Sequence, residues 1–239
     1  MPMSATKAHH HDTIEAAARQ AVKERPILFS GPMVRAIIEG RKTQTRRIIK
    51  PQPYQDAGGW WHFDGFRPKA KRNTGAQAGS HPPDEWTLFP YSCPYGSIGQ
   101  RLWVRETWAQ QLDGNFIYRA DQENAYFTLG GTWRPSIHMP RIASRLLLEI
   151  TDVCVQSLQC VDQQDAIDEG VMTLPNRFIF DQLPEYETRY LAWERDGKNG
   201  RHPIGPSPYE RFSMLWKSIH GPESWESNPY VWAITFKPV

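Results

Sequence analysis

The sequence lacks the features that mark membrane proteins, disulfide frameworks and the common metal or nucleotide sites. No apolar run approaches the roughly 20 residues that cross a bilayer, and no signal-peptide core is present. The three cysteines have no CxxC spacing, which predicts a reducing cytoplasm and neither a disulfide framework nor a zinc site. P-loop, GxSxG and HExxH patterns are also missing, so we expect no metal or nucleotide cofactor.

Positive charge is scarce over the whole chain but concentrated in one segment. The formal net charge is only +2, yet residues 35–50 contain six bases and one acid, which leaves the remaining chain net negative. Extended nucleic-acid binders usually have a broad basic surface. The local patch therefore favours a nucleotide-sized partner or a short RNA contact. The pattern does not indicate an oligomeric state.

Composition predicts one large domain with an appendage and two insertions. The 239 residues are 39% hydrophobic and 12% aromatic, which is enough for a core. Residues 1–24, with a histidine triplet and a short helical pattern, are expected to form an N-terminal appendage. The domain, residues 25–239, is interrupted at about 51–98, where Pro, Gly and Trp are frequent, and at about 172–206.

Capping residues and hydrophobic periodicity predict the regular elements. Helices are expected after Gly31-Pro32, from Asp162 to Gly170, and after Ser207-Pro208. Strands are expected at 27–30, 99–109, 115–121, 144–158 and 229–239. This order has no βαβ rhythm, so it predicts an α+β fold built around a small barrel.

Four segments together resemble a known family. ILFSGPMVRAIIEGRKTQTRR, GQRLWVRETWA, DAIDEGV and NPYVWAITFK are similar, in this order, to the ASCH-domain family, especially its longer phage and prophage members. The resemblance covers roughly residues 25–50, 95–171 and 207–238. It implies a PUA-like fold, a small curled β-barrel with short flanking helices, whose cleft receives RNA or a modified base.

The resemblance also implies three catalytic residues. Some ASCH members hydrolyse the amide of N4-acetylcytidine with a Lys, a Thr three residues later and a distant Glu, which match Lys42, Thr45 and Glu169. A threonine hydroxyl is a poor nucleophile unless a base takes its proton, and a lysine can do so only when it is neutral. Burial and nearby cations lower a lysine pKa. The cations available in the same segment are Arg41, Arg46 and Arg47.

The spacing of this group sets a geometric condition. In a regular strand, Lys42 and Thr45 would point to opposite faces, because side chains alternate. A shared site therefore requires a turn, a bulge or a helical residue between them. Glu169 comes at the end of a predicted short helix; a carboxylate exposed beside the helix cap is the alternative.

Seven further residues are candidates for substrate contact: Phe29, Ser30, Arg41, Arg47, Glu106, Trp133 and His138. Phe29 and Ser30 precede a helix N-terminus, whose free N–H groups suit an acyl oxygen or a phosphate. A tryptophan can stack on a pyrimidine, and a histidine in a proline-bounded loop is well placed for function. Each has a structural alternative: Glu106 can pair with a cation, Trp133 can pack in the core, and His138 can be solvated.

Two classes of function follow from these patterns. The first is a metal-independent amidohydrolase on N4-acylated cytidine nucleosides, with a Lys42-activated Thr45 nucleophile and Glu169 as general acid and base. The alternative is a non-catalytic RNA-binding PUA-like module or an ASCH-type ribonuclease. The small basic footprint favours the first, with a modified pyrimidine nucleoside as the substrate.

Overall fold

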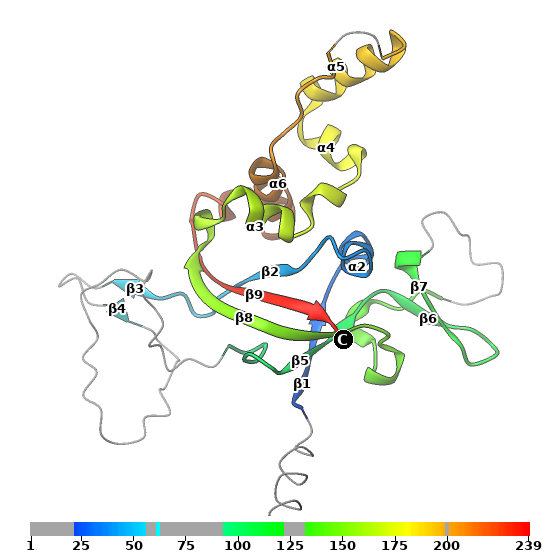
Figure 1. The fold of residues 1–239 in the computed structure, drawn as a ribbon, viewed down its shortest axis with the longest axis vertical. Coiled ribbons are helices and arrows are strands. Elements are labelled where there is room, and N and C mark those ends of the chain that lie inside the picture. Colours follow the sequence, from blue (N-terminus) through cyan, green and yellow to red (C-terminus); the bar gives the residue numbers. More distant parts are fainter. Residues whose placement is uncertain (1–21, 56–60, 63–92, 122–131, 199–200) are drawn as a thin grey trace, which may run out of the picture.

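A five-stranded mixed sheet forms the centre of the molecule (Figure 1). The computed structural model describes residues 22–55, 61–62, 93–121, 132–198 and 201–239. The strand order is β1 (Glu24–Leu28), β5 (Arg101–Arg105), β8 (Leu147–Ser157), β9 (Tyr230–Pro238) and β2 (Gln44–Ile48). β1 and β5 are parallel, and every other neighbouring pair is antiparallel.

Two short ribbons accompany the central sheet. β3 (Tyr54–Gln55) pairs with β4 (Trp61–His62), and β6 (Trp108–Gln110) pairs with β7 (Phe116–Tyr118). The long strand β8 curves across the sheet, and its register against β9 shifts between Ile150 and Asp152 (Figure 1).

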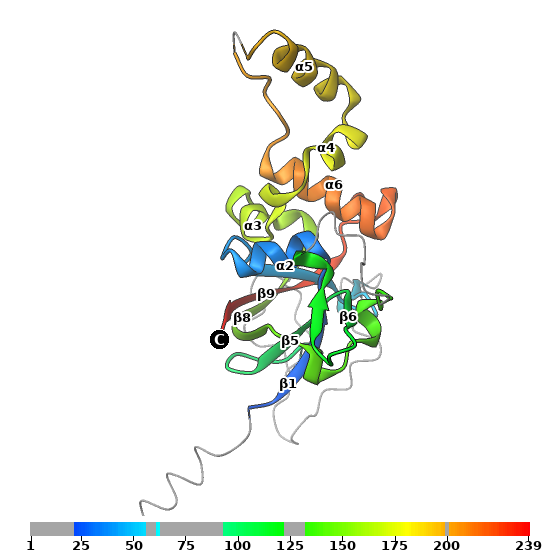
Figure 2. The same cartoon turned by 90° about the vertical axis from the view of Figure 1, so that its right-hand side faces the viewer.

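Helices cover the sheet and extend beyond it (Figure 2). The α-helices of the described residues are α2 (Gly31–Ile38), α3 (Gln163–Asp168), α4 (Asn176–Gln182), α5 (Pro184–Arg195) and α6 (Pro208–His220). α2, α3 and α6 lie near the sheet, whereas α4 and α5 project away from it (Figures 1 and 2). Short 3-10 helices span Arg119–Asp121, Ser136–His138, Arg141–Ala143, Leu158–Cys160, Val171–Thr173 and Pro222–Ser224. None of the described helices is long and apolar enough to cross a membrane.

Capping fixes where the helices near the sheet begin and end. Ser207 and Glu210 form a capping box at the start of α6, as Asp162 and Asp165 do for α3. Gly170 follows the end of α3 with φ at +80°, a conformation that favours glycine. Phe212 and Trp216 of α6 are buried in the main hydrophobic core, which also contains Ile234 of β9.

The α+β class is confirmed, but the sheet is not closed. β1 and β2 remain its two edges, and no strand ladder joins them within the described ranges. β1 also begins at Glu24 instead of Ile27, because it pairs in register with β5 from Arg101 onward. The folded domain therefore starts one residue inside the segment 1–24 that was expected to be an appendage.

The other expected segments are placed only in part. The histidine triplet and the helical pattern of the N-terminus lie outside the described residues, as does most of the segment 51–98. The described part of 51–98 supplies β3 and β4. The segment 172–206 supplies α4 and α5, the two helices that project from the body (Figure 2).

Candidate active site

The chain between α2 and β2 is irregular at the point where a shared site requires it. The backbone N–H of Lys42 still donates to Ala36 O of α2, at 3.0 Å. The next residue, Thr43, donates its N–H to Asp168 O at the end of α3, at 2.9 Å. β2 begins only at Gln44, so the strict alternation of a strand does not apply across residues 42 to 45.

Lys42 is buried, and its amine has three acceptors. The residue is 3% exposed, and Nζ donates to Glu169 Oε2, Glu169 O and Gln44 O, each at 2.8 Å. Burial lowers the pKa of Lys42, and the cations of Arg47 and Arg46 lower it further, while the Glu169 carboxylate opposes this shift. The amine is therefore easier to deprotonate than an ordinary lysine.

Glu169 connects Lys42 to a second buried cation. The Glu169 residue is 4% exposed, and its Oε1 accepts from Arg46 Nη1 at 3.3 Å. Arg46 Nη2 lies 2.8 Å from Asp165 Oδ2. Lys42, Glu169, Arg46 and Asp165 thus form one chain of alternating charges, which we call the ion-pair chain. Its two cations and two anions balance, as buried charges require.

Thr45, on the strand that also carries Arg46, has a hydroxyl without a partner among the described residues. The residue is 3% exposed, and it pairs with Ile234 of β9. No hydrogen bond joins its hydroxyl to any residue that the structure describes. Because Lys42 Nζ donates to Gln44 O, the amine contacts the peptide group that leads into Thr45. Lys42 is therefore bonded to Glu169 and to the carbonyl of Gln44, the residue that precedes Thr45.

Phe29 lies beneath two cations at the end of β1. Its ring centroid is 5.4 Å from Lys42 Nζ and 5.3 Å from Arg47 Cζ. Arg47 Nη2 also donates to Leu28 O at 2.7 Å. A side chain of the edge strand β2 thereby reaches the end of the opposite edge strand β1.

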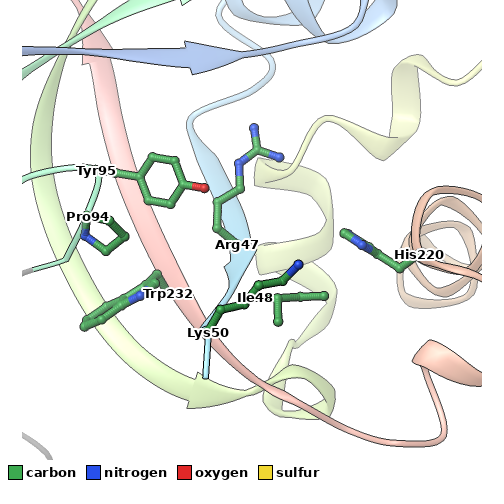
Figure 3. Close-up of a pocket in the computed structure, with 7 residues that line it drawn as sticks. All are labelled: Arg47, Ile48, Lys50, Pro94, Tyr95, His220 and Trp232. Carbon is green, nitrogen blue, oxygen red and sulfur yellow. The ribbon is translucent and has the colours of Figure 1, made fainter. Parts of the chain in front are cut away.

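A cavity of about 430 Å³ lies next to this group (Figure 3). Its lining residues are Arg47, Ile48, Lys50, Pro94, Tyr95, His220 and Trp232. Lys42, Thr45 and Glu169 do not line it. Arg47 does, and its guanidinium lies over the same Phe29 ring as the Lys42 amine. The cavity is of the size that small-molecule ligands occupy in proteins.

Two of the predicted contact residues lie near the site without joining the ion-pair chain. Ser30 is the exposed N-cap of α2, and its side chain makes no capping hydrogen bond. Arg41 is exposed and forms an ion pair with Glu39. The expectation that Arg41 acts on the pKa of Lys42 is wrong, because its guanidinium is engaged at the surface; Arg46 and Arg47 take that role.

Glu106 and Trp133 each contact a cation outside the ion-pair chain, and His138 lies at the surface. Glu106 is 1% exposed and pairs with Arg145, with Nε 2.9 Å from Oε1. Burial raises the pKa of Glu106, and Arg145 opposes that shift.

Trp133 lies under the Arg119 guanidinium, 5.5 Å from Cζ to the ring centroid. His138 is exposed on a short 3-10 helix. Pairing of Glu106 with a cation was the alternative weighed for it.

The sequence did not identify Arg46 and Asp165 as members of the site. It also did not identify the aromatic residues that line the cavity, Tyr95 and Trp232. Alternation along β2 could have identified Arg46, because consecutive arginines on a strand must face opposite sides of the sheet. Tyr95 and Trp232 come from segments far apart in the chain, and nothing local indicates that they meet.

We expect Gly170→Ala to destabilise the protein through Lys42. A Cβ at Gly170 would lie 3.0 Å from Lys42 Cβ and 3.3 Å from Ala36 Cβ, and φ is +80°. The left-handed backbone alone costs a non-glycine residue about 1–2 kcal/mol, and crowding a packed site adds about 1–3 kcal/mol. Urea denaturation measures the total.

Gly40→Ala is the matched control for that crowding. Gly40 also follows a helix and has φ at +72°, but a Cβ there meets nothing within 4 Å. Its loss of stability should be the backbone cost alone, about 1–2 kcal/mol. Equal losses for the two variants would contradict the close packing of Gly170 on Lys42.

Comparisons with known proteins add no relative. No protein-family model, no curated protein and no solved structure matches this chain.

Proposed function

We propose that this protein is an amidohydrolase that removes the acyl group from N4-acylated cytidine. The observation that carries the proposal is the buried Lys42 amine, which donates to Glu169 Oε2 at 2.8 Å and to the carbonyl of Gln44. The next residue, Thr45, is buried, and its hydroxyl makes no hydrogen bond among the described residues. A base, a nucleophile and a carboxylate are what amide hydrolysis requires. The resemblance to ASCH-domain proteins supplies the substrate.

In the first half of the reaction, Thr45 Oγ1 attacks the acyl carbon and its proton passes to the neutral amine of Lys42. The tetrahedral intermediate then collapses with cleavage of the C–N4 bond. The departing N4 takes the proton back from the Lys42 ammonium, so cytidine leaves with a free amino group. The acyl group remains as an ester on Thr45.

In the second half, water attacks the ester carbon while Lys42 again accepts a proton. Collapse of this intermediate releases the carboxylic acid and restores the Thr45 hydroxyl. Glu169 orients the Lys42 amine through its 2.8 Å hydrogen bond and, as general acid and base, takes up or returns the proton that Lys42 carries.

We also propose that the curled sheet is a PUA-like barrel left open at one seam. The bend of β8, with its register shift near Ile150, supports this reading. The hydrogen bond from Arg47 to Leu28 O supports it too, because it links the two edge strands. The site then lies at the seam, beside α2.

The test is to incubate the protein with N4-acetylcytidine at a series of pH values and to measure the rate of cytidine release by chromatography. Hydrolysis needs the neutral form of Lys42, and burial lowers the pKa of that amine below the usual value of about 10.4. The rate should therefore rise with pH through the lowered pKa and level off above it. Below it, kcat/KM should fall about tenfold per pH unit, as the ammonium replaces the amine.

A rate that stays flat or falls as pH rises through the alkaline range would contradict a lysine base. RNA binding without cytidine release from any acyl size would overturn the hydrolase and leave a binding module in its place.

A further inference from the structure

The cavity beside the ion-pair chain carries positive charge with no acidic residue in its lining. Arg47 supplies this charge from β2 and Lys50 from the segment after β2, and the imidazole of His220 joins them from the end of α6. Lys50 is exposed and forms no ion pair with any described residue. Arg47 donates to the Leu28 carbonyl and lies over Phe29, so no described carboxylate pairs with it either.

The pKa of His220 is affected by the same positive charges. Burial lowers the pKa of His220, and the Arg47 and Lys50 cations lower it further. Its ring also lies 4.3 Å from the Trp216 ring, between centroids, which fixes it at this end of α6. A bound anion would offset the repulsion among these groups.

Aromatic side chains form the opposite wall. Tyr95 and Trp232 lie on one side of Arg47, Ile48 and Lys50, while His220 lies on the other (Figure 3). Trp232 is directly opposite Arg47 in the β2–β9 ladder. An aromatic wall facing basic groups suits a nucleotide, because the ring faces contact the apolar part and the cations contact the phosphate.

The candidate nucleophile lies on the same segment as two residues of the cavity lining. Thr45, Arg47 and Lys50 follow one another on the same segment, and an extended chain covers at most about 17 Å over five residues. A single nucleotide fits within that length. Its base would point toward Thr45 and its phosphate toward Lys50.

We propose that this cavity binds a phosphate group attached to the acylated nucleoside, so that the substrate is a nucleotide, free or within RNA, and not the bare nucleoside. The assignment of the acylated base rests on the proposed function; the phosphate site rests on the cavity alone.

Calorimetric titration of the full chain with cytidine and with cytidine 5′-monophosphate tests it. Two cations and an imidazole around one phosphate should give the nucleotide at least about tenfold tighter binding at low salt. Raising the salt should reduce this preference, since Lys50 and His220 are exposed. Equal affinity for the two ligands would overturn the phosphate site.

Lys50→Ala tests whether the cavity is the source of the preference for the nucleotide. Because Lys50 is exposed, its loss should lower the nucleotide-to-nucleoside preference about fivefold. His220→Gln should lower the preference too, and more strongly in acidic buffer, where the wild-type ring carries a charge. Lys198→Ala, the matched control, removes one exposed lysine shortly after α5, a helix that projects from the body (Figure 1), and should leave the preference as it is. An unchanged preference in Lys50→Ala and His220→Gln would contradict the assignment.

A short RNA with internal phosphates and free ends distinguishes the two sources of phosphate. Tighter binding of the RNA supports a phosphodiester ligand, and tighter binding of the monophosphate supports a free nucleotide. Hydrolysis of N4-acetylcytidine with no phosphate preference would defeat this inference alone. A phosphate preference without any hydrolysis would defeat the proposed function alone.

Discussion

Thr45→Val should abolish hydrolysis of N4-acetylcytidine while leaving the fold intact. Valine has nearly the shape of threonine and suits a strand, and the hydroxyl that it removes makes no hydrogen bond within the described residues. Removal of a catalytic nucleophile costs many orders of magnitude in rate. We expect kcat to fall by at least about 10³-fold, measured as cytidine release under single-turnover conditions.

Thr45→Ser is the control, because it keeps a hydroxyl at the same position and should retain measurable turnover. The Tm of Thr45→Val should stay within a few degrees of wild type, since the change removes no described polar contact. Full activity in Thr45→Val would exclude Thr45 as the nucleophile. Hydrolysis would then have to proceed by direct attack of water.

Among the single substitutions considered for stability, Glu169→Gln should lower the free energy of unfolding most. The carboxylate lies between two buried cations, Lys42 and Arg46, and glutamine removes its charge without changing its shape. Taking one partner from a buried ion pair costs about 3–5 kcal/mol, because the other charge is left uncompensated. For a chain of this length we expect the Tm to fall by roughly 10 °C in a thermal melt.

Two further variants show whether the loss of stability in Glu169→Gln comes from its charge or from its packing. Adding Lys42→Met to Glu169→Gln removes one stranded cation, so the double variant should lose less than the sum of the single losses, by about 1–3 kcal/mol. Glu149→Gln is the surface control, since Glu149 pairs with the exposed Lys237 and should cost under about 1 kcal/mol. Losses in Glu169→Gln as small as in Glu149→Gln would show that the ion-pair chain contributes nothing to stability.

Local chemistry explains which elements the sequence predicts well. The capping box of Ser207 with Glu210 and the Pro208 that follows place the start of α6 at the observed residue. Asp162 and Gly170 do the same for the two ends of α3. These signals involve residues within a few positions of one another, so no tertiary information is needed to interpret them.

Contacts between distant segments explain what the sequence does not predict. β1 starts at Glu24 because β5, far along the chain, offers a partner there. Whether the sheet closes depends on the curvature of β8 and on how β1 and β2 meet, and neither leaves a local pattern. Strand propensities therefore predict β1, β5, β7, β8 and β9 at least in part, but neither the edge strand β2 nor the open seam.

In the site, too, local patterns predict some features, and contacts between distant segments determine the others. The resemblance identifies Lys42 and Glu169, but their hydrogen bond depends on α3 ending against the segment that follows α2. Arg41 and Arg46 are equivalent by composition; the backbone turns one toward solvent and the other into the ion-pair chain. The lining of the cavity, assembled from several segments, has no signature in any one of them.

The position of β2 at the edge of the sheet gives its basic residues another role. An edge strand has unpaired backbone groups that can recruit a strand from another molecule, and charged side chains on the edge discourage such pairing. Arg47 and the exposed Lys50 lie on or next to this edge, whereas Arg46 is buried in the ion-pair chain. The charges of Arg47 and Lys50 therefore also disfavour self-association along this edge. Substitutions that neutralise them act on colloidal stability as well as on chemistry.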